Sequence, residues 1–209
     1  FEKKMYEMHE YRYSGEHNRF DYSNSFFEMI DSISLDAVIK YVEKVKNPTS
    51  SFDKFLNSRG YTASDYLNDI AGTLCIRNMR YGDAVKYLSN VNVNYRFHQN
   101  VYMQFDPFSF DRKKIEKGSE FKYDFAVKMH ALEQGINTVS DPNRKAWLML
   151  KYAVGLYNSF SKCWALTQYY KGYTFSRVWE NEDYTLAVIK KAQNLIDEAC
   201  ASVKLKESN

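Results

Sequence analysis

Hydrophobic residues recur along most of the chain at the three- and four-residue spacing of an α-helix, without the alternation typical of β-strands. A clear example begins after Ser34, a good N-cap residue, and stops before Asn47 and Pro48. The face expected to point inward consists of Leu35, Val38, Ile39, Val42 and Val45. This spacing predicts an all-α fold.

Two more helix starts follow closely. A short helix is predicted from Ser50 or Ser51 to Gly60, because glycine readily takes the left-handed conformation that ends many helices. Its inward side chains are expected to be Phe52, Phe55 and Leu56. Thr62 and Asp65 have the spacing of a capping box and predict a further helix. Its inward face is expected to hold Tyr66, Leu67, Ile70, Ala71, Leu74 and Cys75.

The middle of the chain combines a short helix with a long irregular stretch. After a break at 78–81, a helix is predicted over 82–91. Residues 92–118 then show no sustained period, which predicts one long irregular loop rich in aromatic residues. Loops of this length inside a domain are commonly functional.

Helical spacing returns at Ser119 and continues to the end of the chain. Asp141 and Pro142 mark a helix start, a turn is expected at 160–162, and helices are predicted over 163–170 and about 183–205. In the helix that begins at Ser119, the residues expected to face inward are Phe121, Phe125, Met129, Leu132 and Ile136. In the helix after Asp141 they are Ala146, Trp147, Leu150, Ala153, Val154 and Tyr157. In the last helix they are Leu186, Ile189, Ile196, Ala199, Cys200 and Val203.

Composition narrows the class of protein. Only 8 glycines and 3 prolines in 209 residues count against a β-sandwich or barrel, which needs many tight turns. A net charge of +3 is too small to indicate a nucleic-acid partner, and no segment reaches the roughly 18 apolar residues that span a bilayer. We therefore expect one helical domain over 1–209. Because the chain opens at Phe1 in charged sequence, we expect it to be a fragment of a longer chain.

Residues that carry chemistry are scattered. Cys75, Cys163 and Cys200 are far apart in apolar surroundings and are expected to be buried free thiols. None of the 4 histidines belongs to a zinc-binding motif, and His130 is expected to be a partly buried structural residue. Motifs of phosphate-binding loops, dinucleotide folds and serine hydrolases are missing. The sequence therefore predicts no catalytic residue, no metal site and no cofactor.

Two predicted helix pairs share a spacing of small residues that lets antiparallel helices approach closely. The first pair holds Gly72, Ala84 and Leu88, and the second holds Ala153, Ala165 and Tyr169. With Tyr81, the first set resembles the tetratricopeptide (TPR) helix-turn-helix unit, although Asn68 stands where that repeat has tryptophan. The resemblance implies an array of antiparallel helix pairs that presents a surface to a protein or peptide.

A second resemblance concerns location. The string at 163–170 is similar to segments of helical-repeat proteins of the bacterial envelope that have no known activity. TPR-type repeats also occur in the aromatic-rich SusD-like glycan-binding lipoproteins of outer membranes. These resemblances imply a periplasmic or cell-envelope location, with glycan binding as an alternative to protein binding.

The long loop supplies the candidate site. Its aromatic residues are Tyr95, Phe97, Tyr102, Phe105, Phe108 and Phe110. Flat apolar rings beside amide groups suit an extended peptide or the faces of sugars. Tyr95, Tyr102 and Phe105, which have polar neighbours, are the candidate ligand-binding residues, whereas Phe108 and Phe110 are expected to fix the loop on the domain. The alternative is that all of these rings only anchor the loop. A non-catalytic protein- or peptide-binding scaffold is the function that this sequence favours.

Overall fold

The computed structural model describes residues 33–59, 64–92, 105–111, 122–161, 163, 166–167 and 182–203. These residues form seven α-helices and no β-strand, so the predicted all-α fold is confirmed for them. The helices are α3 (Leu35–Lys46), α4 (Ser51–Arg59), α5 (Ser64–Arg77), α6 (Tyr81–Leu88), α8 (Lys122–Thr138), α9 (Pro142–Ser161) and α11 (Glu182–Ser202).

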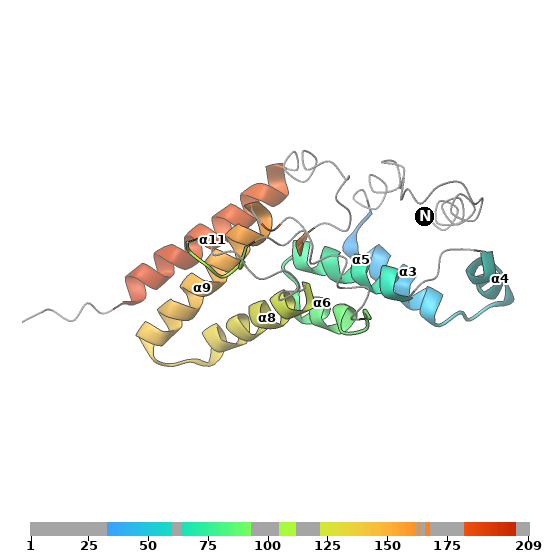
Figure 1. Ribbon diagram of the computed structural model, residues 1–209, viewed down its shortest axis with the longest axis horizontal. Helices are drawn as coiled ribbons and strands as arrows, with labels where there is room; N and C mark the ends of the chain where they lie inside the picture. Colours follow the sequence, from blue (N-terminus) through green and yellow to red (C-terminus); the bar gives the residue numbers. More distant parts are fainter. Residues whose placement is uncertain are drawn as a thin grey trace, which may run out of the picture.

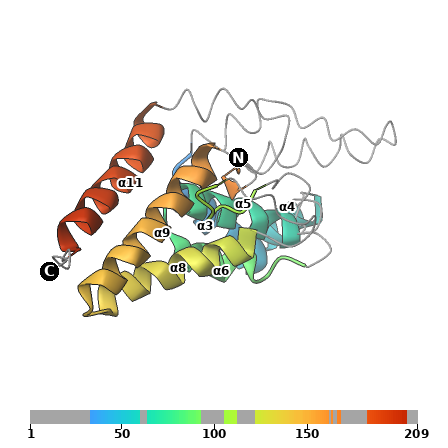
Figure 2. The ribbon, with the colours of Figure 1, turned by 60° about the vertical axis from the view of Figure 1, so that its left-hand side comes forward.

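The helices form a stack that follows the order of the chain. Helix α3 packs on α5, α5 on α6, α6 on α8, α8 on α9, and α9 on α11, while α4 lies against α3. Figure 1 shows α4 and α11 at opposite ends of the molecule. Short turns join α5 to α6 and α8 to α9, so each of these two pairs is an antiparallel hairpin (Figure 2).

Three predicted helix starts are confirmed in their capping contacts. At α9, the Asp141 carboxylate accepts the backbone N–H of Arg144 at 3.1 Å. At α3, the Ser34 hydroxyl accepts the backbone N–H of Ala37 at 3.3 Å. At α4, the Ser50 hydroxyl accepts the N–H of Asp53 at 3.0 Å, and the Asp53 carboxylate accepts the N–H of Ser50 at 3.1 Å. This reciprocal pair is a capping box, which satisfies N–H groups that the first turn of a helix otherwise leaves open.

Helix α5 lies at the centre of the stack, and every residue from 67 to 76 is buried. Its contact with α6 is close because Gly72 has no side chain: a Cβ there would lie 2.6 Å from Leu88 Cδ2. Ala84 on α6 is fully buried as well. The predicted close approach of these two helices through small residues is therefore confirmed.

The end of α5 is closed by two kinds of contact. Met79 has a positive φ of 56°, and the N–H groups of Met79 and Arg80 bond back to the carbonyls of Ile76 and Cys75 at 2.9 and 2.8 Å. This Schellman arrangement turns the chain into α6. Further away in sequence, Arg77 donates from Nε and Nη2 to the carbonyl oxygen of Thr167, at 3.0 and 2.9 Å.

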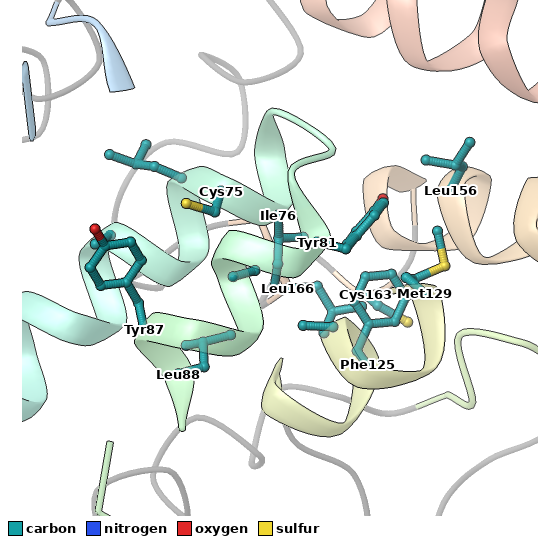
Figure 3. Packing of buried hydrophobic residues seen from close by; sticks show 14 of the residues in the cluster. Cys75, Ile76, Tyr81, Tyr87, Leu88, Phe125, Met129, Leu156, Cys163 and Leu166 are labelled. Atoms are coloured by element: carbon teal, nitrogen blue, oxygen red, sulfur yellow. The ribbon is translucent and has the colours of Figure 1, made fainter. Parts of the chain in front are cut away.

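Aromatic side chains join the two hairpins in the core. The ring of Tyr81 on α6 meets Phe125 on α8 and Tyr152 on α9 edge to face, with centroids 6.1 and 5.9 Å apart. Met129 and Leu156 lie beside them (Figure 3). Such edge-to-face pairs are favourable because the positive ring edge meets the negative ring face.

Several predicted inward faces are wrong. On α4, Phe52 and Phe55 are exposed, at 65% and 54%, while Asp53 is buried. On α9, Trp147 and Tyr157 are more than half exposed. Helix α11 packs on α9 through Val188, Ala192, Leu195 and Ala199, and of its predicted face only Ala199 is buried.

Two smaller predictions need correction. Cys75 and Cys163 are buried as expected, but Cys200 is exposed. Burial raises the pKa of the Cys75 thiol to about 12. After α9, the N–H of Leu166 donates to the carbonyl oxygen of Cys163 at 2.9 Å, as in a tight turn. Of the helix predicted over 163–170, the described residues are Cys163, Leu166 and Thr167, and none of these three is α-helical. Ala165 and Tyr169, like residues 1–32, lie outside the described residues.

Candidate ligand-binding surface

The three candidate residues from the sequence have different outcomes. Tyr95 and Tyr102 lie outside the described residues. Phe105 is half-buried, and its ring packs against the main core. Its carbonyl oxygen accepts a hydrogen bond from Sγ of Cys163 at 3.5 Å. Phe105 therefore has a clear anchoring contact.

The segment 105–111 runs along α9 (Figures 1 and 2). Nδ2 of Asn158 donates to the carbonyl oxygens of Pro107 at 2.9 Å and Ser109 at 3.2 Å. Three residues earlier on α9, Gly155 lets Phe108 come close, since a Cβ at Gly155 would lie 2.9 Å from Phe108 Cε1. The path of the segment is thus fixed by α9.

Phe108 anchors this segment, as the sequence predicts. Its buried ring lies 5.5 Å from that of Phe125, and Nζ of Lys128 stands 5.6 Å from its centroid. The backbone N–H of Phe108 donates to Oδ1 of Asp106 at 2.9 Å, which closes the turn. These contacts agree with the expectation that part of the loop is structural.

Phe110 differs from its predicted role, because it lies on the surface beside Trp147. The two rings are 51% and 53% exposed, with centroids 6.4 Å apart and planes inclined by 33°. Nζ of Lys151 stands 5.4 Å from the Trp147 ring centroid, within cation–π range. The aromatic pair Phe110–Trp147 is thus an exposed contact between this segment and α9.

Sequence reasoning missed Trp147 as a surface residue, although a signal was present. Arg144 and Lys151 lie three residues before and four residues after it, so all three share one face of the helix. A tryptophan between two basic residues at this spacing belongs to a solvent-facing stripe, and Arg144 is indeed exposed.

A buried ion pair lies in the interior, between α8 and α5. Nζ of Lys122, the first residue of α8, contacts Oδ1 of Asp69 at 3.2 Å and Oγ1 of Thr73 at 2.9 Å. The Lys122 and Asp69 side chains are each 2% exposed. Burial lowers the pKa of Lys122 below its usual 10.5, and the Asp69 carboxylate opposes that shift. This enclosed pair joins α8 to α5.

Among the residues that the structure describes, no three histidine, cysteine or acidic side chains come together in a group that would hold a metal ion. Within the same residues, no helix is long and apolar enough to cross a bilayer.

Comparisons of the whole chain with protein-family models, curated proteins and solved structures found no match.

Proposed function

We propose that this protein is a non-catalytic, TPR-like helical scaffold that binds a protein or peptide, and that the aromatic pair Phe110–Trp147 is part of its binding surface. The observation that carries the proposal is the exposure of these two rings side by side. Large exposed aromatic residues are frequent hot spots of protein interfaces, because they bury much apolar area at a low cost in side-chain entropy.

The packing of the helices supports the scaffold part of this proposal. TPR arrays stack helix hairpins so that each packs mainly on its sequence neighbours. Helices α5 to α11 pack in that order, and the α5–α6 hairpin has small residues, Gly72 and Ala84, at its close contact. Asn68 occupies the tryptophan position of the repeat and bonds to Lys46 at 2.8 Å, so a polar contact replaces a packed ring there.

The charges beside the aromatic pair indicate the chemistry of the partner. Arg144 is exposed and Lys151 is half-buried on the face of α9 that holds Trp147. In a partner peptide, an apolar side chain would contact the two rings, and carboxylates on either side of it would contact the two cations. A sugar stacked on the face of Trp147 occupied by Lys151 has to displace that ammonium group. This favours a peptide over a glycan, which stays the alternative partner.

Peptide display tests the proposal without a known partner. A random 12-residue peptide library is selected on the whole chain, and enriched peptides are titrated against wild type, Phe110→Ala and Trp147→Ala by fluorescence anisotropy. We expect enriched sequences to combine acidic and apolar residues. Each substitution should weaken binding by at least about tenfold, equivalent to about 1.4 kcal/mol. Melting temperatures should stay nearly unchanged, because both rings are half exposed.

Phe52→Ala is the matched control, since Phe52 is also an exposed ring but lies on α4 at the other end of the stack. It should leave peptide binding unchanged. Enriched peptides that bind Phe110→Ala and Trp147→Ala as tightly as wild type would refute this surface. Binding to a glycan array, lost in Trp147→Ala and without any peptide selected, would instead support the glycan alternative.

A further inference from the structure

Helix α11 carries two apolar stripes, and only one of them packs on α9. The packed stripe is Val188, Ala192, Leu195 and Ala199. The second stripe contains four large apolar side chains that are 39–47% exposed: Leu186, Ile189, Ile196 and Val203. At 100° per residue it lies about 100° around the helix from the packed stripe. It therefore lies on the side of α11 next to the α9 contact, where it is exposed.

The spacing of this exposed stripe is that of a coiled-coil seam. Its positions are Leu186, Ile189, Gln193, Ile196, Cys200 and Val203, all exposed. The intervals are three, four, three, four and three residues, which is the a/d pattern of a heptad repeat. Such a seam packs against a second helix with the same pattern.

The stripe also matches itself in the antiparallel direction. Its residues form three pairs, and the two members of each pair lie equally far in sequence from a point between residues 194 and 195. The pairs are Leu186 and Val203, Ile189 and Cys200, and Gln193 and Ile196. If a two-fold axis passes through that point, each residue of one α11 helix faces the other member of its pair on the second helix. Each residue at heptad position a then packs against a residue at position d of the other copy. This is the arrangement of antiparallel coiled coils.

Charged residues beside the stripe complement each other in the same arrangement. Lys190 and Asp197 are exposed and follow Ile189 and Ile196, at the heptad position e. In an antiparallel pair, e faces e of the other helix, so Lys190 of each copy meets Asp197 of the other. Among the residues that the structure describes, no ion pair involves either side chain.

We propose that a second copy of this chain docks on the exposed stripe of α11, and that the two α11 helices pair antiparallel about a two-fold axis near residues 194 and 195. The occupant is a second copy because both the apolar spacing and the Lys190–Asp197 charges are self-complementary. Helices about 30 Å long bury less area than a standard interface, so the dissociation constant is on the order of 1–100 μM. The aromatic pair Phe110–Trp147 takes no part in this pairing.

A charge swap tests the pairing. Dimerisation of the full chain is measured by sedimentation equilibrium from about 1 to 300 μM, a range set by that expected affinity. Lys190→Glu and Asp197→Lys should each raise the dissociation constant at least about fivefold, because like charges then face each other. The double variant should return to within about twofold of wild type. Glu198→Lys is the control, since residue 198 is exposed on the opposite side of α11 and should have no effect.

Cross-linking tests the register independently. Cys200 is exposed and the other two described cysteines, Cys75 and Cys163, are buried. Because Ile189 faces Cys200 of the other copy, Ile189→Cys should give a disulfide-linked dimer under mild oxidation. Wild type should not, since its two Cys200 residues lie about 16 Å apart along the axis in this register.

Each outcome is informative. A chain that stays monomeric to 300 μM overturns the proposal, as does a double charge variant that dimerises no better than the two single variants. A dimer that is unchanged by both charge reversals overturns the α11 interface. The antiparallel register is overturned if wild type cross-links efficiently and Ile189→Cys forms no more disulfide-linked dimer than wild type does.

Discussion

Helices α5 and α11 show opposite relations between polarity and burial. On α5 the polar side chains of Asn68, Asp69 and Thr73 are buried, and each meets a polar partner. On α11 the apolar Ile189 and Ile196 are exposed. Helix α5 has neighbours on several sides, whereas α11 ends the stack of described helices.

The place of a helix in the stack decides which of its side chains are buried. A central helix has to bury nearly its whole circumference, so its polar residues need partners in the interior. A terminal helix buries only the stripe that meets its neighbour.

The largest effect is expected at the buried pair. Lys122→Met leaves the Asp69 carboxylate in the interior without its cation, and should lower the free energy of unfolding by about 3–5 kcal/mol. Urea denaturation measures it. Lys190→Met, on exposed α11, is the matched control and should change stability by less than about 0.5 kcal/mol at protein concentrations well below about 1 μM, where the chain is monomeric. Equal losses of unfolding free energy in the two variants would show that the burial of Asp69 on α5 does not make the removal of its cation more costly.

A smaller loss is expected from one methyl group at the centre of α5. Gly72→Ala forces the new Cβ against Leu88 and should cost about 1–3 kcal/mol. Gly82→Ala is the matched control, because a Cβ there only reaches 3.2 Å from His130 and alanine favours the helix. In a Leu88→Ala background the effect of Gly72→Ala should shrink, as a double-mutant cycle measures. A full-sized effect in that background would contradict the contact.

Neighbouring residues on α11 provide the next comparison. Leu195 is half-buried against α9 and Ile196 is exposed. Leu195→Ala should cost about 1–2 kcal/mol, less than a fully buried leucine, while Ile196→Ala should stay within about 0.5 kcal/mol. Thermal melts at low protein concentration, where the chain is monomeric, measure both. A larger loss for Ile196→Ala would mean that the wrong stripe has been assigned to the interior.

The smallest effect concerns pH and helix α4, which resembles α11 in exposing large apolar side chains. The Asp53 carboxylate pairs with Lys44 at 3.0 Å and accepts bonds from Ser50 and Thr49. Lys44, and then Ser50, lower the pKa of Asp53 from 3.8 to about 2.

Because this pKa is lower in the folded state than in the unfolded chain, the unfolded chain binds the proton first. The contribution of Asp53 is therefore complete above pH 4 and is lost as the pH falls towards 2. Asp53→Asn should be less stable than wild type at pH 5, and the difference should narrow at pH 3 in urea denaturation. A difference of the same size at both pH values would contradict this linkage.

Local features of the fold were predictable from the sequence, because they depend on neighbouring residues. Ser34 and Ser50 cap their helices as expected, since a cap needs only a hydroxyl and the next three N–H groups. The close contact of Gly72 with Leu88 was also predictable, because a short turn brings the two helices together.

The choice of the packed stripe on α11 was not predictable in this way. Apolar residues cover about half of its circumference, and the sequence favours the large ones as the inward face. The structure instead places Val188 and Ala192 in the interior, together with Ala199 from the predicted face, and the small alanine side chains let α9 approach closely. A single sequence does not reveal which neighbour a wide apolar face will meet.

The candidate surface depends on contacts between distant residues, which explains why the sequence missed it. Phe110 lies beside Trp147 because Asn158 holds the backbone of Pro107 and Ser109 along α9. Side-chain composition indicated an aromatic loop but gave no information about this path. The sequence assigned Phe110 to the residues that anchor the loop, whereas the structure places it on the surface beside Trp147.

The bonds from Arg77 to Thr167 have a consequence for folding during synthesis. Most helices of the stack pack on the helix before them, so they can pack as soon as they have left the ribosome themselves. Arg77 instead bonds to a carbonyl 90 residues further along. At roughly 5–20 residues per second, translation needs roughly 5–20 s to supply that acceptor. The last turn of α5 is therefore completed long after its own hairpin, and this late, non-local closure should slow folding relative to a purely sequential stack.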